Sequence, residues 1–146
     1  MIGAKELSEK LKLLSLNLPN LLLETANELQ EFIEQLNKDQ LKTGYDSEDI
    51  FLGYYKPSTL KRKARSGGKV VSKNNEIALY DTGKFWNSIV SNVVGYEIIL
   101  NAKDEKLSIL KEVHTQNILG LNSSNKNKLT EKFCNVLALK IKNYVL

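Results

Sequence analysis

With 146 residues, the chain has the length of one ordinary domain. It is 42% hydrophobic and 26% charged, which allows a packed core and excludes global disorder. The formal net charge is +4, and the one cysteine, Cys134, excludes an intrachain disulfide.

The N-terminal residues are expected to form a helix that Pro19 interrupts. Leucines recur at helical spacing from Leu7 to Leu18, and Pro19 is expected to end this run or to open the next helix. Residues 1–18 are therefore predicted to be an N-terminal helical extension of a single domain spanning 1–146. The leucine-rich run is too short to span a bilayer, and the first ten residues lack a signal-peptide layout. We expect no export signal and no membrane partner.

A long amphipathic helix is predicted from Asn20 to about Leu41. Apolar residues recur in it every three or four positions, and glutamates lie between them. These glutamates are expected to form a solvated face, or to pair with a basic loop from a neighbouring subunit.

Residues 43–76 show no sustained periodicity and are predicted to form a basic, largely irregular loop within the domain. A short helical turn is expected to start at Ser58 or Thr59, after Pro57. The basic residues gather between Lys56 and Lys73, where there is no acid, whereas the rest of the chain has 14 basic and 17 acidic residues. The seven basic residues are Lys56, Lys61, Arg62, Lys63, Arg65, Lys69 and Lys73.

The second half of the chain alternates strand and helix signals. The Val- and Ile-rich run from Ser88 to Ala102, broken at Gly95-Tyr96, predicts a β-hairpin. A short helix is expected at residues 104–115, and a third strand at residues 117–122. Ser123 or Ser124 is expected to cap a last helix. The inward face of that helix would contain Leu129, Phe133, Val136, Leu137, Ile141 and Tyr144. The overall prediction is an α+β fold.

The triplet Asp81-Thr82-Gly83 matches the active-site triplet of aspartic peptidases, in which two such aspartates share one proton. The residues around it do not suit that chemistry. Lys84, Phe85 and Trp86 are too bulky for the tight active-site loop, and the chain leaves no room for a glycine-rich flap. The residues before the triplet are mostly helical or irregular, whereas the peptidase is all-β.

The alternative is that the triplet begins a helix. Asp81 is predicted to accept hydrogen bonds from the free amides of the first turn, with Thr82 as a rival cap. Tyr80 and Phe85 would then have the spacing of a hydrophobic staple. On this interpretation, the triplet supports the local backbone and takes no part in catalysis.

The order of four short motifs resembles that of the phage virion morphogenesis family, the tail-completion or head–tail joining proteins of tailed bacteriophages. The motifs read PSTLKRK (57–63), LYDTGKFWNSI (79–89), VHT (113–115) and ILGLN (118–122). Residues 20–146 take part in the resemblance. Phe85-Trp86 stands where Leu-Arg is more usual in the family, and Gln116 and Asn117 stand where an arginine is often found.

The resemblance implies a structural virion protein at the neck or tail end of a particle, assembled in the cytoplasm of the bacterial host. It would form a ring of identical copies and join the tail to the DNA-filled head through other neck, portal or tail proteins. No catalytic residue comes with the family, so the motif residues would serve folding. They are Tyr80, Asp81, Thr82, Gly83, Phe85, Trp86, Ser88, Ile89, Leu119, Gly120 and Leu121.

The basic segment is the predicted binding surface. Its seven cationic side chains suit contact with DNA or with an acidic patch on a partner, and such contact would be salt-dependent. The alternative function is therefore a small nucleic-acid-binding protein that uses residues 56–73, with Tyr54 and Tyr55 available for stacking on bases. The lone His114 has no second histidine or nearby cysteine, so we expect neither a metal site nor a cofactor. Cys134 is expected to be buried and inert.

Overall fold

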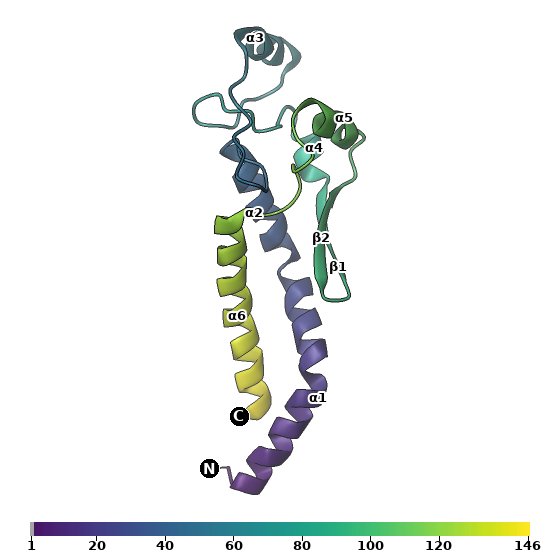
Figure 1. The fold of residues 1–146 in the computed structure, drawn as a ribbon, viewed down its shortest axis with the longest axis vertical. Coiled ribbons are helices and arrows are strands. Elements are labelled where there is room, and N and C mark those ends of the chain that lie inside the picture. The colour runs from purple at the N-terminus through teal and green to yellow at the C-terminus, as the bar shows by residue number, and fades with distance from the viewer. Residues whose placement is uncertain (1) are drawn as a thin grey trace.

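The computed structural model describes residues 2–146 and has an elongated shape, with a two-helix stem and a wider head (Figure 1). Helix α1 (Ala4–Glu28) and the C-terminal helix α6 (Ser123–Val145) lie side by side and antiparallel in the stem. Helix α2 (Gln30–Lys42) continues from α1 into the head. The head also contains α3 (Pro57–Ser66), α4 (Lys84–Asn87) and α5 (Lys106–Val113). The predicted α+β class is confirmed.

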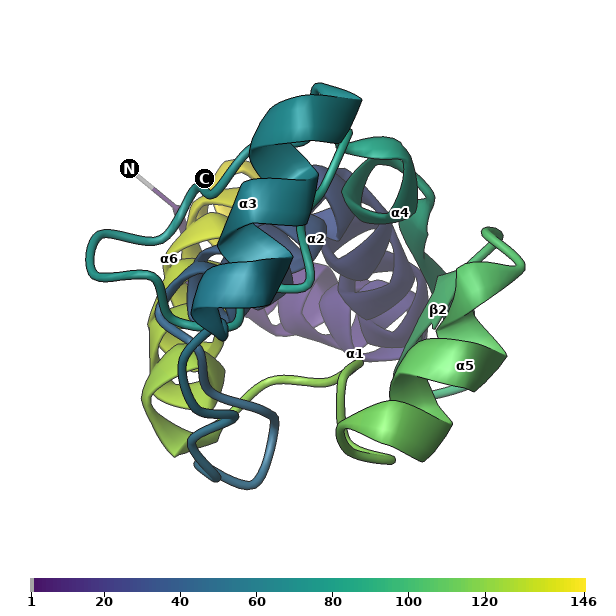
Figure 2. The ribbon, with the colours of Figure 1, turned by 90° about the horizontal axis from the view of Figure 1, so that it is seen from above.

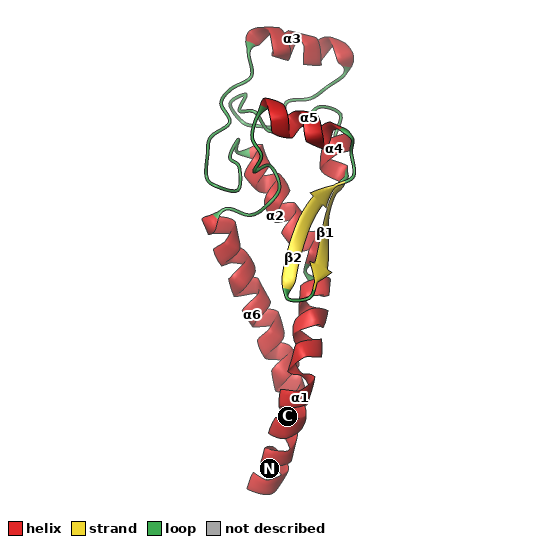
Figure 3. Cartoon of the chain, turned by 45° about the vertical axis from the view of Figure 1, so that its right-hand side comes forward, coloured by secondary structure: helices red, strands yellow, loops and turns green. Residues whose placement is uncertain are grey.

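A two-stranded antiparallel hairpin lies beside α1 and α2, on the side away from α6 (Figure 3). Strands β1 (Ile89–Val94) and β2 (Glu97–Ala102) pair with Ile89 opposite Ala102 and Val94 opposite Glu97. The turn is Gly95-Tyr96, as the sequence predicts, and Gly95 has a φ of 60°. The expected third strand at 117–122 is wrong, because that segment runs from α5 to α6 without pairing with the hairpin.

Two apolar clusters hold the elements together. In the head, Leu41, Leu79, Phe85, Ile89 and Ile118 pack into one buried cluster with Ala102. Lower down, α2, the hairpin and α6 share a second cluster that the predicted inward face of α6 joins through Leu129, Phe133 and Val136. Both clusters bring together apolar side chains from distant parts of the sequence. Burial of these side chains holds the hairpin and α6 on opposite sides of α2.

Helix α1 passes through Pro19 without ending, contrary to the prediction of a boundary there. Proline removes one backbone hydrogen bond to the carbonyl four residues earlier, which belongs to Ser15. Both Ser15 and Pro19 are exposed, so water can solvate that carbonyl. Beyond Pro19 the helix is held by packing, because Leu21, Thr25 and Ala26 are buried. The helix ends instead at Leu29, whose amide donates to the carbonyls of Thr25 and Ala26.

Three further local expectations differ from the structure. The side chain that caps α6 is that of Asn122, which accepts from the Asn125 amide at 3.0 Å, and not that of Ser123 or Ser124. Cys134 is exposed on α6 and not buried. The predicted loop 43–76 is more ordered than expected, because α3 is ten residues long and two isolated β-bridges flank it.

Candidate functional site

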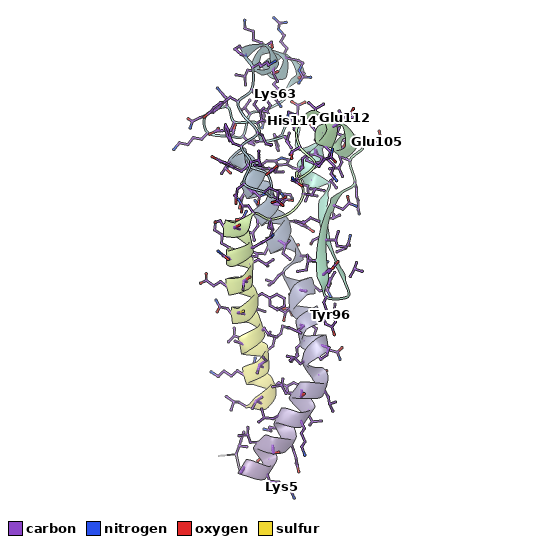
Figure 4. The ribbon with its side chains drawn as sticks, in the orientation of Figure 1. Lys5, Lys63, Tyr96, Glu105, Glu112 and His114 are labelled. Carbon is purple, nitrogen blue, oxygen red and sulfur yellow. The ribbon has the colours of Figure 1, made fainter. Side chains whose placement is uncertain are left out.

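A cleft of about 600 Å³ opens at the head end of the molecule. One wall is α3, a second is the segment 79–86 that leads into α4, and a third is α5. Figure 2 shows α3, α4 and α5 around this end, seen from above. Figure 4 shows Lys63 of α3 and His114, which follows α5, at the same end of the molecule, far from Tyr96 and Lys5. Both Lys63 and His114 line the cleft.

Asp81 is joined to Lys63 and does not cap α4. The Lys63 Nζ lies 3.1 Å from Asp81 Oδ1, donates to the Tyr80 carbonyl at 2.5 Å, and lies 4.9 Å from the centre of the Tyr55 ring. The side chain of Lys63 is only 6% exposed, so these contacts replace water around its charge. The residue that precedes α4 is Gly83, and no side chain caps this helix of four residues. The predicted caps Asp81 and Thr82 are therefore both wrong.

Two glycines make this arrangement possible. At Gly83 the φ is 90°, a conformation that other residues rarely adopt, and a Cβ there would lie 2.7 Å from the Tyr80 hydroxyl. At Gly68 an added Cβ would lie 2.0 Å from Asp81 Oδ1. The Lys69 amide donates to the Asp81 carbonyl at 2.9 Å. The end of α3 thus lies directly against Asp81, and only a residue without a side chain fits between them.

Aromatic side chains form part of the lining of the cleft. The rings of Tyr80 and Trp86 meet edge to face, with centroids 5.0 Å apart, and Trp86 Nε1 donates to the Ala78 carbonyl at 3.0 Å. Tyr80 therefore packs on Trp86 rather than on Phe85, which differs from the predicted hydrophobic staple. Phe85 is instead 5% exposed in the head core. Burial raises the pKa of Tyr55 above its ordinary value, against smaller opposing effects of nearby backbone groups.

The lining of the cleft combines exposed cations with aliphatic side chains. Of the residues that line it within 2–146, only Asp81 is acidic, and Lys63 already neutralises that carboxylate. Glu105, which precedes α5, and Glu112, on α5, do not line the cleft. The exposed cationic lining residues are Lys56, Arg62, Lys84 and Lys106, and the aliphatic ones are Ile77, Leu79, Ile109, Leu110 and Val113. Such a lining suits an anionic group attached to an apolar one.

His114 stands at the end of α5, where its amide donates to the Leu110 carbonyl at 3.0 Å. Partial desolvation lowers the pKa of His114 below its ordinary value of 6.5. The imidazole is therefore neutral near pH 7, and it adds no positive charge to the cleft.

The structure divides the predicted basic surface. Six of its seven side chains are exposed, but Lys63 is buried in contacts with Tyr80 and Asp81 and is not available to a partner. Lys61, Arg62 and Arg65 line a shallow depression on α3. Lys56 and Arg62 also line the cleft. One lysine of the basic segment thus stabilises the fold, and the other six basic side chains form an exposed cationic surface.

The remaining motif residues take folding positions. Ser88 Oγ donates to the Phe85 carbonyl at 2.7 Å and accepts from the Asp104 amide at 3.2 Å, and Ile89 is buried. Leu119 packs against the head cluster, and Leu121 is buried in the second cluster. The Gly120 amide donates to Asn37 Oδ1 at 3.3 Å.

Sequence reasoning missed a buried polar cluster that joins α2 to the start of α6. Asn37 Nδ2 donates to the Ile118 carbonyl at 3.2 Å, and Gln40 Oε1 accepts from the Asn122 amide at 2.7 Å. Asn125 Nδ2 donates to the Leu36 carbonyl at 3.1 Å. A signal was present, because Asn37 and Gln40 interrupt an otherwise apolar helix face. Sequence reasoning also missed Lys84 and Lys106 as members of the cationic cleft, since neither belongs to the basic run.

In the part of the chain that the structure describes, no group of three or more His, Cys, Asp or Glu side chains is placed to hold a metal ion. Among the helices of residues 2–146, none combines the length and the apolar character needed to cross a bilayer. Comparison with protein-family models, curated proteins and solved structures finds no match for this chain.

Proposed function

We propose that the chain is a structural virion protein of the phage head–tail interface, a neck or tail-completion adaptor that acts without catalysis. The observation that carries this proposal is the position of the motifs that resemble the phage virion morphogenesis family. Three of the four line one cleft, through Thr59 and Lys63, through residues 79–86, and through Val113 and His114. Three motifs that are far apart in the sequence thus meet at one surface. Their proximity supports the interpretation that they belong to a single family pattern.

The fourth motif supports the same proposal from inside the molecule. Ile118 is fully buried in the head cluster, and the Gly120 carbonyl accepts from Gln40 Nε2 at 3.1 Å. This motif therefore holds α2 next to the start of α6. The motifs account for the construction of the head and its cleft, as expected for a protein that works by fitting against others.

Exposed apolar side chains give such a protein surfaces for partners. On the hairpin, Val94, Tyr96 and Ile99 are exposed, with Tyr96 at 89%. On the first half of α1, Leu7, Leu11, Leu13 and Leu16 are exposed. Large apolar side chains exposed together on a protein surface are typical of interaction surfaces. On this proposal the partners are further copies in a ring and neighbouring neck, portal or tail proteins of the virion.

Gene deletion in the phage genome that encodes the chain tests the proposal. We expect lysates that contain DNA-filled heads and separate tails, seen by electron microscopy, and joining that is restored when the protein is supplied in trans. The protein should also co-sediment with complete particles. Normal yields of tailed particles without the gene would refute the proposal.

The second candidate is a nucleic-acid-binding protein that acts outside any particle. The observation that favours it is the exposed cationic surface on α3 formed by Lys61, Arg62 and Arg65, together with Lys69 and Lys73. Of these residues, Lys61, Arg62 and Arg65 line one depression, and Lys69 and Lys73 are exposed later in the chain. A cationic surface of this kind would bind DNA with an affinity that falls steeply with salt. The variant K61E/R65E tests this candidate, because it removes charge from the surface of α3 without touching Lys63. Unchanged DNA affinity in this variant would exclude the candidate.

A further inference from the structure

We infer that the cleft of one copy receives the acidic tip at residues 48–50 of a neighbouring copy. This inference rests on the proposed function, because it names the contact through which identical subunits would join. The tip displays the carboxylates of Glu48 and Asp49 and the side chain of Ile50, which is 58% exposed. It lies on the loop between α2 and α3, and none of its three residues lines the cleft of its own chain.

The tip is built as a rigid turn. Asp46 is 1% exposed, and its Oδ1 accepts from the amides of both Glu48 and Ile50 at 2.9 Å. Its Oδ2 accepts from Thr115 Oγ1 at 2.8 Å, and the Ser47 amide donates to the Asn117 carbonyl at 3.0 Å. A buried carboxylate thus fixes the turn to the segment after α5. Little conformational entropy would be lost when such a tip enters a partner.

The tip and the cleft match in charge and in polarity. Two carboxylates beside one aliphatic side chain form the tip, and four exposed cations and five aliphatic side chains line the cleft. Ile50 would contact the exposed side chains of Ile109 and Val113, while Glu48 and Asp49 would face Lys84 and Lys106. Complementary charge of this kind sets the register and the partner more than it sets affinity.

Three glutamates of the N-terminal helices, Glu24, Glu28 and Glu34, are poorer candidates for the acidic partner. Glu28 Oε1 lies 2.6 Å from Lys140 Nζ, and Glu24 Oε2 lies 3.6 Å from the same atom. Glu34 Oε1 accepts from the amide and the hydroxyl of Ser91. These acids already have partners within their own chain. The acid of the 48–50 tip remains exposed and is carried on a projecting turn.

A tip and a cleft on different parts of the surface make a head-to-tail contact, which closes into a ring or continues as a filament. Each copy would use its tip on one neighbour and its cleft on the other. A variant that loses one of the two surfaces keeps the other. The two surfaces can therefore be tested separately and then in a mixture.

The experiment measures self-association of the full chain by sedimentation velocity at low and high salt. The tip variant is E48K/D49N, where asparagine is chosen because Asp49 has a φ of 59°. The cleft variant is K84E/K106E, and the control is K128E/K132E, which reverses two exposed charges on α6. We expect the wild type and the control to associate, and each of the two interface variants to associate at least about tenfold more weakly. Association of the wild type should weaken as salt rises.

Mixing the two interface variants is the decisive step. Each variant retains the surface that the other lacks, so an equimolar mixture should form a one-to-one dimer and no larger species. A wild type that stays monomeric, variants that associate like the wild type, or a mixture that stays monomeric would each overturn the inference. Binding of a single-stranded oligonucleotide that K84E/K106E abolishes, with self-association unchanged, would assign the cleft to nucleic acid and overturn it as well.

Failure of this inference is distinguishable from failure of the proposed function. If the gene is needed for head–tail joining but the charge-reversed variants assemble normally, the inference fails and the proposed function stands. If deletion leaves joining intact, the proposed function fails whatever the sedimentation result.

Discussion

Lys63 Nζ lies 3.1 Å from Asp81 Oδ1, and this ion pair ties α3 to the chain that leads into α4. The side chain of Lys63 is 6% exposed and that of Asp81 is 39% exposed. Substituting Asp81 by Asn should lower the free energy of unfolding by about 1–3 kcal/mol. The loss is smaller than for a fully buried pair, because water reaches the carboxylate.

A double-mutant cycle with Lys63→Met separates this role from helix capping. The cost of Asp81→Asn should fall by at least about 0.5 kcal/mol when Lys63 is already Met, because no buried charge is then left unpaired. Urea unfolding of the four proteins measures the coupling. Thr82→Ala is the control, with an expected change within about 0.5 kcal/mol, since Thr82 is exposed and caps no helix. Additive effects would mean that Asp81 acts independently of Lys63.

Replacing Asn37 by Ala should lower the free energy of unfolding by at least about 2 kcal/mol. Asn37 is fully buried, and its removal leaves the Ile118 carbonyl and the Gly120 amide without their partner. Urea unfolding measures the loss, and Glu31→Ala, at an exposed position of the same helix, is the matched control. Equal stability of the two variants would contradict a structural role for the buried polar cluster.

Replacing Pro19 by Ala should raise stability by about 1–3 kcal/mol, because alanine restores the missing amide in the interior of α1. Far-UV circular dichroism during thermal unfolding measures the gain. Ser8→Ala, at an exposed position of the same helix, controls for helix propensity alone and should give a smaller gain. A loss of stability in Pro19→Ala would show that the proline marks a needed break.

The pKa of His114 gives a pH dependence whose sign can be worked out. Desolvation lowers this pKa in the folded chain, so the unfolded chain binds the proton at a higher pH. The contribution of neutral His114 to stability is therefore present above about pH 6.5, falls as the pH drops towards the folded pKa, and is constant below it.

NMR titration of the imidazole should give a midpoint below 6.5, and His114→Gln should flatten this part of the curve of stability against pH. A midpoint above 6.5 would reverse the sign and contradict the desolvation of the ring.

The elements that the sequence predicts well are those whose signals are local. Helical periodicity is a local signal that marks residues 20–41 and α5, although Leu29 divides the predicted long helix between α1 and α2. The paired apolar runs around Gly95-Tyr96 are equally local. The boundary predicted at Pro19 is wrong because the helix continues into packed structure, where Leu21, Thr25 and Ala26 are buried and α1 contacts both α6 and β1. Tertiary contacts overrode a local rule at that position.

The site was harder to predict because its contacts are not local. Asp81 was expected to cap the helix next to it, but its partner is Lys63, 18 positions earlier in the chain. The cleft adds Lys84 and Lys106 to the predicted cations, and only the folded arrangement brings α5 to face α3. A composition count finds the basic segment, but it cannot tell a buried lysine from an exposed one.

The exposed thiol of Cys134 allows site-specific chemical labelling of the stem. It is the only cysteine in the sequence, so a maleimide reagent would modify one position on α6 and leave the head untouched. A gold cluster attached there would report, in electron micrographs of a particle, where the stem points. Pairs of fluorophores on adjacent copies would report their spacing by energy transfer.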